Sequence, residues 1–268
     1  AASDVYKRQG FSAYSFSRLR DAGTARPLPA TYHSTPRPFA YGRLGVDRTL
    51  RTTRQLLGFP QLLLFVVAFL FYNDGVQTVI RITPVFASET LDLSATTIAA
   101  VFVVIQLVAF FGALSFGWLA GRVGAKRAIL VSIVGWALVT VGGYLMPARQ
   151  VAPFLLLGVL AGLVLGGVQA LSRSLYGSMI PEEASAEFFG FYSVFSKFSA
   201  IFGPLIFAIV DIATGSTRLS ILFLTAFFVI GGGFLSRVDV EAARASRNEW
   251  SLDEPPMPPD READRASP

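Results

Sequence analysis

The side chain best placed for chemistry inside an apolar segment of this sequence is the carboxylate of Asp74. It follows Asn73 in the middle of the first long apolar stretch, where a charge costs about 2.5 kcal/mol or more in hydrocarbon. At 100° per residue in a helix, Gln77, Thr78 and Arg81 fall on the same face as Asp74. We expect this polar face to border a water-filled cavity or a neighbouring helix, where it could bind a proton or a polar solute.

A structural role is the alternative for Asp74, which could cap a helix break at Gly75 or bond a neighbouring helix for packing alone. Lys197 is a second charge, deep within the fifth apolar stretch. Because Asp74 is the only carboxylate expected at a comparable depth, the two are predicted to form a charge pair, or to be used alternately by substrate and protons. The alternative is that Lys197 reaches the cytoplasmic interface along its aliphatic stem.

Polar side chains also occur in the second and fourth apolar stretches. Gln106 lies in the second, and Gln169 and Arg173 lie one helical turn apart in the fourth. Hydrogen bonding between helices is enough to explain a Gln there, and Arg173 could simply mark the cytoplasmic end of its helix. The functional interpretation places all three, with Asn73, on the same substrate or ion pathway as Asp74.

Little of the chemistry that enzymes and metal sites use is present. The sequence has no Cys and one His, His33, in the polar N-terminal stretch, so disulfides, thiol catalysis and Cys/His metal cages are excluded. It contains no Walker-type phosphate loop, no G-x-S-x-G elbow and no H-E-x-x-H motif. We therefore expect no enzyme activity, no metal and no cofactor.

The composition predicts an all-α membrane protein. Of 268 residues, 53% are hydrophobic and 15% are charged, and the mean hydropathy is +0.53, too apolar for a soluble domain. A helix needs about 20 apolar residues to cross the bilayer. Segments of that kind predict six transmembrane helices, at approximately 59–82, 97–119, 128–146, 151–173, 188–212 and 219–236.

The distribution of Lys and Arg predicts the topology. Most basic residues fall before the first predicted span, or in the connections that share its side of the membrane, so both termini are expected in the cytoplasm. Residues 1–57 are interpreted as a basic linker, with 42–57 either an amphipathic surface helix or a solvated segment. The six spans occupy 58–237, and the polar tail 238–268 is expected to be disordered. The net charge of +5 suits anionic lipid rather than nucleic acid.

Small residues and one proline predict how the helices pack and move. Gly158, Gly162 and Gly166 recur on one face of the fourth span, a pattern that lets another backbone approach closely. Gly203 and Pro204 lie inside the fifth span, where a proline frees a backbone carbonyl and favours a kink or hinge. Both features are expected of a mobile helix bundle.

The basic turn after the second span resembles the cytoplasmic loop signature of the major facilitator superfamily. That signature reads Gly, three residues, Asp, Arg, any residue, Gly, Arg, Lys. The positions that match are Gly117, Arg122, Gly124, Lys126 and Arg127. Gly121 stands where the family has Asp, which weakens the charge-relay latch that the resemblance implies for this gating loop.

Longer strings resemble one branch of that superfamily, the bacterial relatives of the fungal vacuolar amino-acid effluxers of autophagy. They are FYNDGVQTVI at 71–80, GVQALSRS at 167–174, Ile180-Pro181, and EFFG at 187–190. The resemblance covers roughly 58–238. It implies the C-terminal half of a twelve-helix bundle with substrate bound between two halves, and the chain is then expected to begin within a longer protein.

Taken together, the sequence predicts part of a secondary transporter that moves a small solute, such as an amino acid, by alternating access. Its expected partners are membrane lipid, the solute, protons and a missing N-terminal six-helix half, and its expected location is the bacterial inner membrane. The rival interpretation is a membrane scaffold or receptor-like module without transport. Asp74, Gln106, Gln169 and Lys197 distinguish the two, because side chains that face separate directions favour the scaffold.

Overall fold

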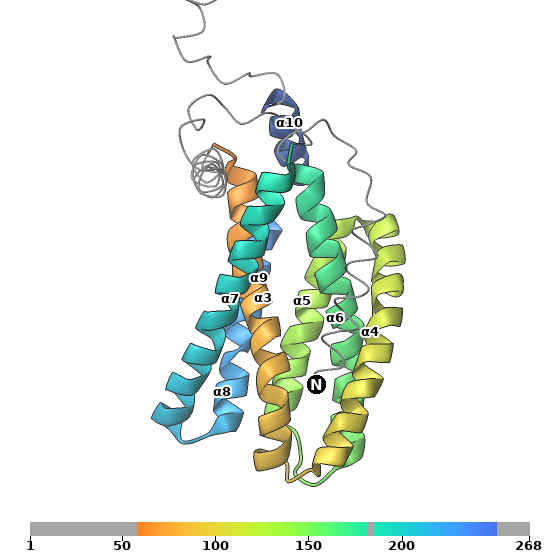
Figure 1. Ribbon diagram of the computed structural model, residues 1–268, viewed down its shortest axis with the longest axis vertical. Coiled ribbons are helices and arrows are strands. Elements are labelled where there is room, and N and C mark those ends of the chain that lie inside the picture. The colour runs from red at the N-terminus through yellow and green to blue at the C-terminus, as the bar shows by residue number, and fades with distance from the viewer. Residues whose placement is uncertain (1–57, 182–184, 251–268) are drawn as a thin grey trace, which may run out of the picture. The chain divides into compact units, whose positions relative to one another are not determined.

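The computed structural model describes residues 58–181 and 185–250, apart from the side chains of residues 186, 187, 198–200 and 248–250. The linker 1–57, with its possible amphipathic helix at 42–57, lies outside the described residues, as does 251–268. The described part is helical and contains no strand, and we label its elements as in Figure 1. They are α3 (Pro60–Val85), the π-helical turn η2 (Phe86–Thr90), α4 (Ala95–Val123), α5 (Ala125–Tyr144), α6 (Val151–Met179), α7 (Ser185–Thr214), α8 (Thr217–Phe223), α9 (Thr225–Arg237) and α10 (Val240–Trp250).

Six of these helical stretches are long and apolar enough to cross a membrane, which confirms the predicted number of spans. α3 continues through η2 as one stretch over Pro60–Thr90, and α8 and α9 together form the last over Thr217–Arg237. The chain runs up and down through the bundle, so the start of α3, the end of α9 and the short helix α10 lie at one end (Figure 1). We refer to this end as the α10 end.

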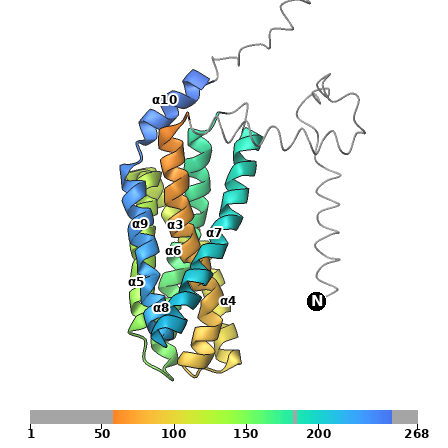
Figure 2. The same ribbon diagram turned by 90° about the vertical axis from the view of Figure 1, so that its left-hand side faces the viewer.

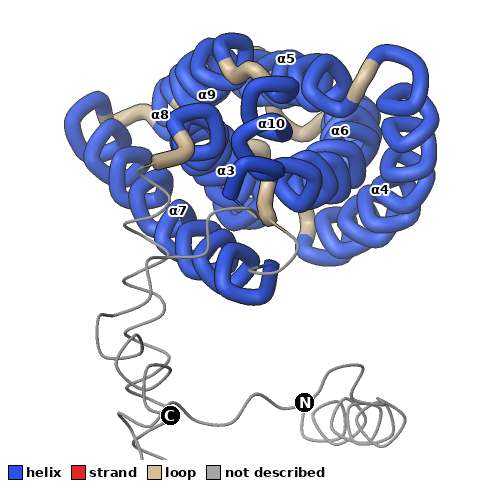
Figure 3. Tube along the Cα trace, turned by 90° about the horizontal axis from the view of Figure 1, so that it is seen from above, coloured by secondary structure: helices blue, strands red, loops and turns tan. Residues whose placement is uncertain are grey.

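The core lies where α3, α5, α6 and α9 meet. Its largest fully buried side chains include Phe65, Tyr72, Trp136, Tyr176 and Phe228. The rings of Trp136 and Phe228 stack with centroids 6.0 Å apart. α4 and α7 lie at opposite outer edges (Figures 1 and 3), and in Figure 2 both lie on the side away from α5 and α9. Much of their apolar surface is left uncovered by the rest of the chain.

Helix α3 is continuous through its polar middle, so Asp74 does not cap a break at Gly75. Pro60 begins the helix, where its missing N–H costs no hydrogen bond. Gly75 instead allows α9 to approach, because a Cβ at this position would lie 2.9 Å from the Phe228 ring and 3.2 Å from Cβ of Phe227. The middle of α3 is therefore held closely against α9.

The predicted glycine face of the fourth span lies against α4. A Cβ at Gly162 would be 2.8 Å from the backbone oxygen of Ile105, and one at Gly166 would be 2.6 Å from the backbone nitrogen of Ala113. Gly112 on α4 meets the α6 backbone in the same way, 2.8 Å from Cα of Leu163. Side chains larger than hydrogen at these positions would separate the two helices.

The basic turn between α4 and α5 connects two parts of the α10 end. Gly124 has a φ of 89°, a conformation that favours glycine. Lys126 follows it and donates hydrogen bonds to the backbone oxygens of Ser236 and Val238, at 2.8 and 2.7 Å. The start of α5 is thereby attached to the end of α9. Arg122 lies over the Trp118 ring, 3.8 Å from its centroid.

The expectation of disorder over 238–268 is wrong for residues 240–250, which form α10. Asp239 caps this helix, because its side chain accepts from the backbone N–H groups of Glu241 and Ala242, both at 3.0 Å. Ala243 is buried, and Arg244 donates to the Ser178 hydroxyl at 3.3 Å. The helix is stabilised by contacts with α3 and α6, which the polar composition of the tail does not reveal.

Candidate functional site

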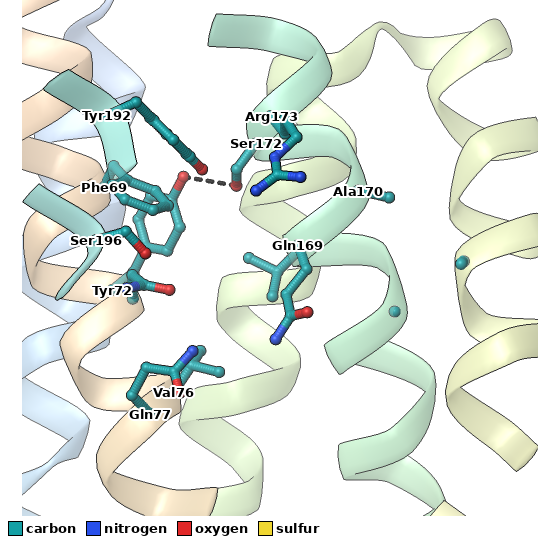
Figure 4. Close-up of a pocket in the computed structure, with 14 residues that line it drawn as sticks. Phe69, Tyr72, Val76, Gln77, Gln169, Ala170, Ser172, Arg173, Tyr192 and Ser196 are labelled. Carbon is teal, nitrogen blue, oxygen red and sulfur yellow. Dashed lines mark hydrogen bonds between the residues drawn. The ribbon is translucent and has the colours of Figure 1, made fainter. Parts of the chain in front are cut away.

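A cavity of about 490 Å³ lies between α3 and α6, with one side formed by α7 (Figure 4). The four helices that line it, α3, α4, α6 and α7, all correspond to predicted spans. The lining residues are Phe69, Tyr72, Asn73, Val76 and Gln77 from α3, Ala113 from α4, Gly166, Val168, Gln169, Ala170, Ser172 and Arg173 from α6, and Tyr192 and Ser196 from α7.

Four of the residues predicted from the sequence come together here. Asn73 and Gln77 lie one turn apart on α3, and Gln169 and Arg173 lie one turn apart on α6. Figure 4 shows the side chains of Gln77, Gln169 and Arg173 extending into the space between the helices. Gln169 and Arg173 are exposed although they line the cavity, so the cavity is open on this side of the chain.

Hydroxyl and aromatic side chains complete the wall nearer the α10 end, and the sequence analysis did not identify them. The hydroxyls of Tyr72 and Ser172 are joined by a buried hydrogen bond of 2.7 Å across the helix pair. Tyr192 lies against Phe69 with ring centroids 4.4 Å apart, and Ser196 follows it by one turn of α7. Helical spacing could have revealed Ser172, because it lies three residues after Gln169 and so on the same face of α6.

Asp74 lies away from this cavity, on the face of α3 that packs against α7. Asp74 and Thr78 are both 0% exposed. A Cβ at Gly203 of α7 would lie 2.8 Å from Oδ1 of Asp74 and 3.0 Å from Cβ of Thr78. The predicted polar face of α3 is therefore divided: Asp74 and Thr78 border a neighbouring helix, whereas Gln77 lines the cavity. Arg81, on the same face, is exposed and does not line the cavity.

The predicted charge pair between Asp74 and Lys197 is wrong. Within the described residues neither carboxylate oxygen of Asp74 has a hydrogen-bond partner, and Lys197 is exposed and lines none of the cavities described in this section. The physical reason is the helix rotation of 100° per residue. Ser196 faces the cavity, and the next residue is turned away from both the cavity and α3.

Gln106 belongs to a second, smaller cavity of about 200 Å³ between α3, α4, α5 and α6. Its lining is almost entirely apolar and includes Trp136, Phe154 and Leu165. The four residues chosen to distinguish a transporter from a scaffold thus have different surroundings. Gln169 lines the larger cavity, Gln106 the smaller one, Asp74 contacts α7, and Lys197 is exposed.

The larger cavity is equipped for binding rather than for covalent chemistry. It presents three side-chain amides, four hydroxyls and the single guanidinium of Arg173, which together donate and accept hydrogen bonds. No group of three or more His, Cys, Asp or Glu residues that could hold a metal occurs within the described ranges. A small polar solute that carries a carboxylate matches this set of groups.

A family model and individual relatives of this chain point to the same group of membrane proteins. The family model described as "Vacuole effluxer Atg22 like" matches residues 16–248. The chain is 35% identical over 204 residues to a Bacillus subtilis (strain 168) protein named "Uncharacterized MFS-type transporter YxiO", an alignment that covers 76% of this chain and 46% of that protein. It is 30% identical over 226 residues to "Autophagy-related protein 22-1" of Aspergillus niger, covering 80% of this chain and 36% of that protein.

The chain therefore spans less than half the length of these relatives. The family match extends over most of the chain and includes all six apolar stretches that could cross a membrane. The sequence resemblance to this branch of the major facilitator superfamily is thereby confirmed. The protein is an integral membrane protein, and it belongs to the family of the Atg22-like vacuole effluxers.

Proposed function

We propose that this chain is one half of a secondary transporter. The residues that line the cavity between α3 and α6 would form this half's side of the substrate site. The observation that carries the proposal is the open cavity itself, which Asn73, Gln77, Gln169 and Arg173 line from two neighbouring spans. Polar side chains are costly in membrane spans unless they line a cavity or pair with one another. Membership of a family that includes transporters supports the same conclusion.

The cavity favours a solute that carries a carboxylate. Arg173 is its one cationic side chain, and a guanidinium binds a carboxylate through paired hydrogen bonds. The amides of Gln77 and Gln169 can contact further polar groups on the solute. An amino acid has a carboxylate together with polar groups of this kind, which supports the class expected from the sequence.

A second six-helix half would close the open side of the cavity. The chain covers 46% of the length of its bacterial relative, which leaves room for a domain of similar size. The outer surface of α4 exposes apolar side chains beside the cavity, among them Phe110, Phe111, Leu114 and Trp118, and α7 exposes Val194, Ile201 and Leu205 on the other side. These two flanks are suited to contact the second half and the surrounding lipid.

Alternating access would then move one half against the other around a fixed site. The close contact of α4 and α6 at Gly162 and Gly166, and Pro204 inside α7, support a bundle whose helices can shift. We place both termini in the cytoplasm, with α10 on the cytoplasmic side of a bacterial inner membrane. The concentration of basic residues at the α10 end supports this orientation.

The decisive test is transport by the complete reading frame reconstituted in liposomes. Arg173→Gln is expected to abolish exchange of labelled carboxylate-bearing amino acids, because the only cation in the cavity is removed. Arg149→Gln is the matched control, since Arg149 is exposed and paired with Asp92 at the end opposite α10. Equal transport by wild type and Arg173→Gln would rule out this substrate site.

A scaffold without transport is the second candidate, and the separate surroundings of Asp74, Gln106, Gln169 and Lys197 favour it. It predicts that the complete reading frame lacks six further spans and that no amino acid exchanges across the liposomes. Six further spans that end in a basic loop, together with exchange that depends on Arg173, would exclude it.

A further inference from the structure

The contact between α3 and α7 contains three buried polar atoms that have no hydrogen-bond partner within the described residues. They are both carboxylate oxygens of Asp74 and the hydroxyl oxygen of Thr78. The backbone of Gly203 lies against both side chains, yet no hydrogen bond of standard geometry joins it to the carboxylate. An unpaired carboxylate in such a place is costly, because burial removes the water that stabilises its charge.

Arg81, on the same helix, acts on this carboxylate through its charge but forms no ion pair with it within the described residues. The α9 stretch Thr225–Ser236, which packs on α3, carries no charged residue. The charged residues on its own helix and on the spans packed against it are Arg81 on α3, Arg173 on α6, Glu187, Lys197 and Asp211 on α7, Arg237 at the end of α9, and Lys126 and Arg127 at the start of α5. Asp74 is also 0% exposed in this chain alone, so its burial does not require a second half.

We propose that the Asp74 carboxyl is a proton-binding site, closed by Gly203 of α7 and separate from the solute cavity. Addition of a proton to one oxygen removes the negative charge and turns that oxygen into a hydrogen-bond donor. The neighbouring Thr78 hydroxyl can then serve as its acceptor. A proton fits where a larger cation does not, because the α7 backbone is too close to leave space even for a methyl group on Gly203.

Loss of the proton favours separation of α7 from α3. A charged Asp74 requires water or a cation, and neither can reach it while Gly203 stays in contact. Pro204 follows Gly203 and leaves a backbone carbonyl of the preceding turn without its helical donor, so α7 can bend at this level. The link between this movement and transport rests on the proposed function, whereas proton binding itself does not.

Infrared difference spectroscopy of the purified chain in detergent tests the proton site without any transport. A protonated carboxylic acid has a C=O band distinct from those of a carboxylate, and we expect this band to disappear on titration to alkaline pH. Asp74→Asn should lose the band, whereas the matched variant Asp211→Asn should keep it, because Asp211 is partly exposed near the end of α7 and accepts from Ser220. A spectrum without the band, or a band that persists in folded Asp74→Asn, overturns the proposal.

Cysteine labelling tests whether α7 moves, and the native chain has no Cys to interfere. Thr78→Cys places a thiol under Gly203, and Thr140→Cys places one at an equally buried site on α5, where Thr140 contacts Thr225 of α9. The ratio of the two maleimide labelling rates corrects for the general rise of maleimide reactivity with pH. We expect the ratio to rise several-fold with pH when Asp74 is present and to stay constant in Asp74→Asn. A constant ratio in both overturns the movement, while the infrared result still decides the proton site.

Discussion

Two faces of the same helix, α3, place polar side chains in opposite environments. Asn73 and Gln77 face an open cavity rich in hydrogen-bonding groups. Asp74 and Thr78, only one residue further along in each case, are fully buried against α7 and lack partners among the described residues. A step of 100° around the helix thus separates a surface suited to a solute from one suited to a proton.

Among substitutions that add no charge, the largest effect is expected where a methyl group is forced between α3 and α7. Gly203→Ala places a methyl group against the buried side chains of Asp74 and Thr78 on α3. Overpacking of this kind costs roughly 1–3 kcal/mol, and we expect the upper part of that range in thermal or denaturant unfolding in detergent.

Gly190→Ala is the matched control for that substitution. Gly190 lies on the same helix, and a Cβ there would meet nothing within 4 Å. Because alanine favours helix over glycine by about 1 kcal/mol, this variant should be as stable as wild type or more stable. A Gly203→Ala protein that matched it would show that the α3–α7 contact is looser than described.

The next effect concerns the wall of the open face. Tyr72→Phe removes one partner of the 2.7 Å hydrogen bond and leaves the buried Ser172 hydroxyl unpaired, which costs roughly 1–3 kcal/mol of unfolding free energy. Addition of Ser172→Ala should restore part of that loss, because the unpaired group is then absent. A double variant as unstable as the sum of both single variants would argue against a direct bond.

A smaller effect is expected from a charge placed in the open cavity. Gln77→Glu adds a carboxylate where water can enter and where Arg173 lines the same cavity, so we expect a change in stability within about 1 kcal/mol. Thr78→Glu, one residue further along, should be strongly destabilising because that site is closed. Similar unfolding temperatures for the two variants would remove the distinction between the faces.

The sequence alone predicted the six spans because the bilayer imposes a length and an apolar composition that can be recognised without tertiary contacts. It did not predict α10. That helix has a polar composition and depends on contacts at its start and along one face, including the bond from the backbone N–H of Asp239 to the Gln61 side chain at 2.8 Å. Helices stabilised mainly by tertiary contacts leave weak patterns in a sequence.

The candidate site was predictable in part. Asn73, Gln77, Gln169 and Arg173 are conspicuous because amides and guanidinium groups are rare in membrane spans, whereas Tyr192 and Ser196 are ordinary residues in such helices. The surroundings of Asp74 could not be predicted from the sequence, because the rotation of α3 about its own axis is set by its close contacts at Gly75 and Gly203. Periodicity defines a polar face but does not identify the helix or cavity that it meets.

Lys197→Ala gives the smallest expected effect and completes the comparison. Because the lysine is exposed and does not contact Asp74, its removal should change the unfolding free energy by no more than about 0.5 kcal/mol. It should also leave both the infrared band of Asp74 and amino-acid exchange by the complete protein unchanged. Loss of the band would show that Lys197 acts on Asp74 at the contact between α3 and α7. Loss of exchange with an intact band would assign Lys197 to the solute pathway. Retention of both would leave Arg173 as the cation on which solute binding depends.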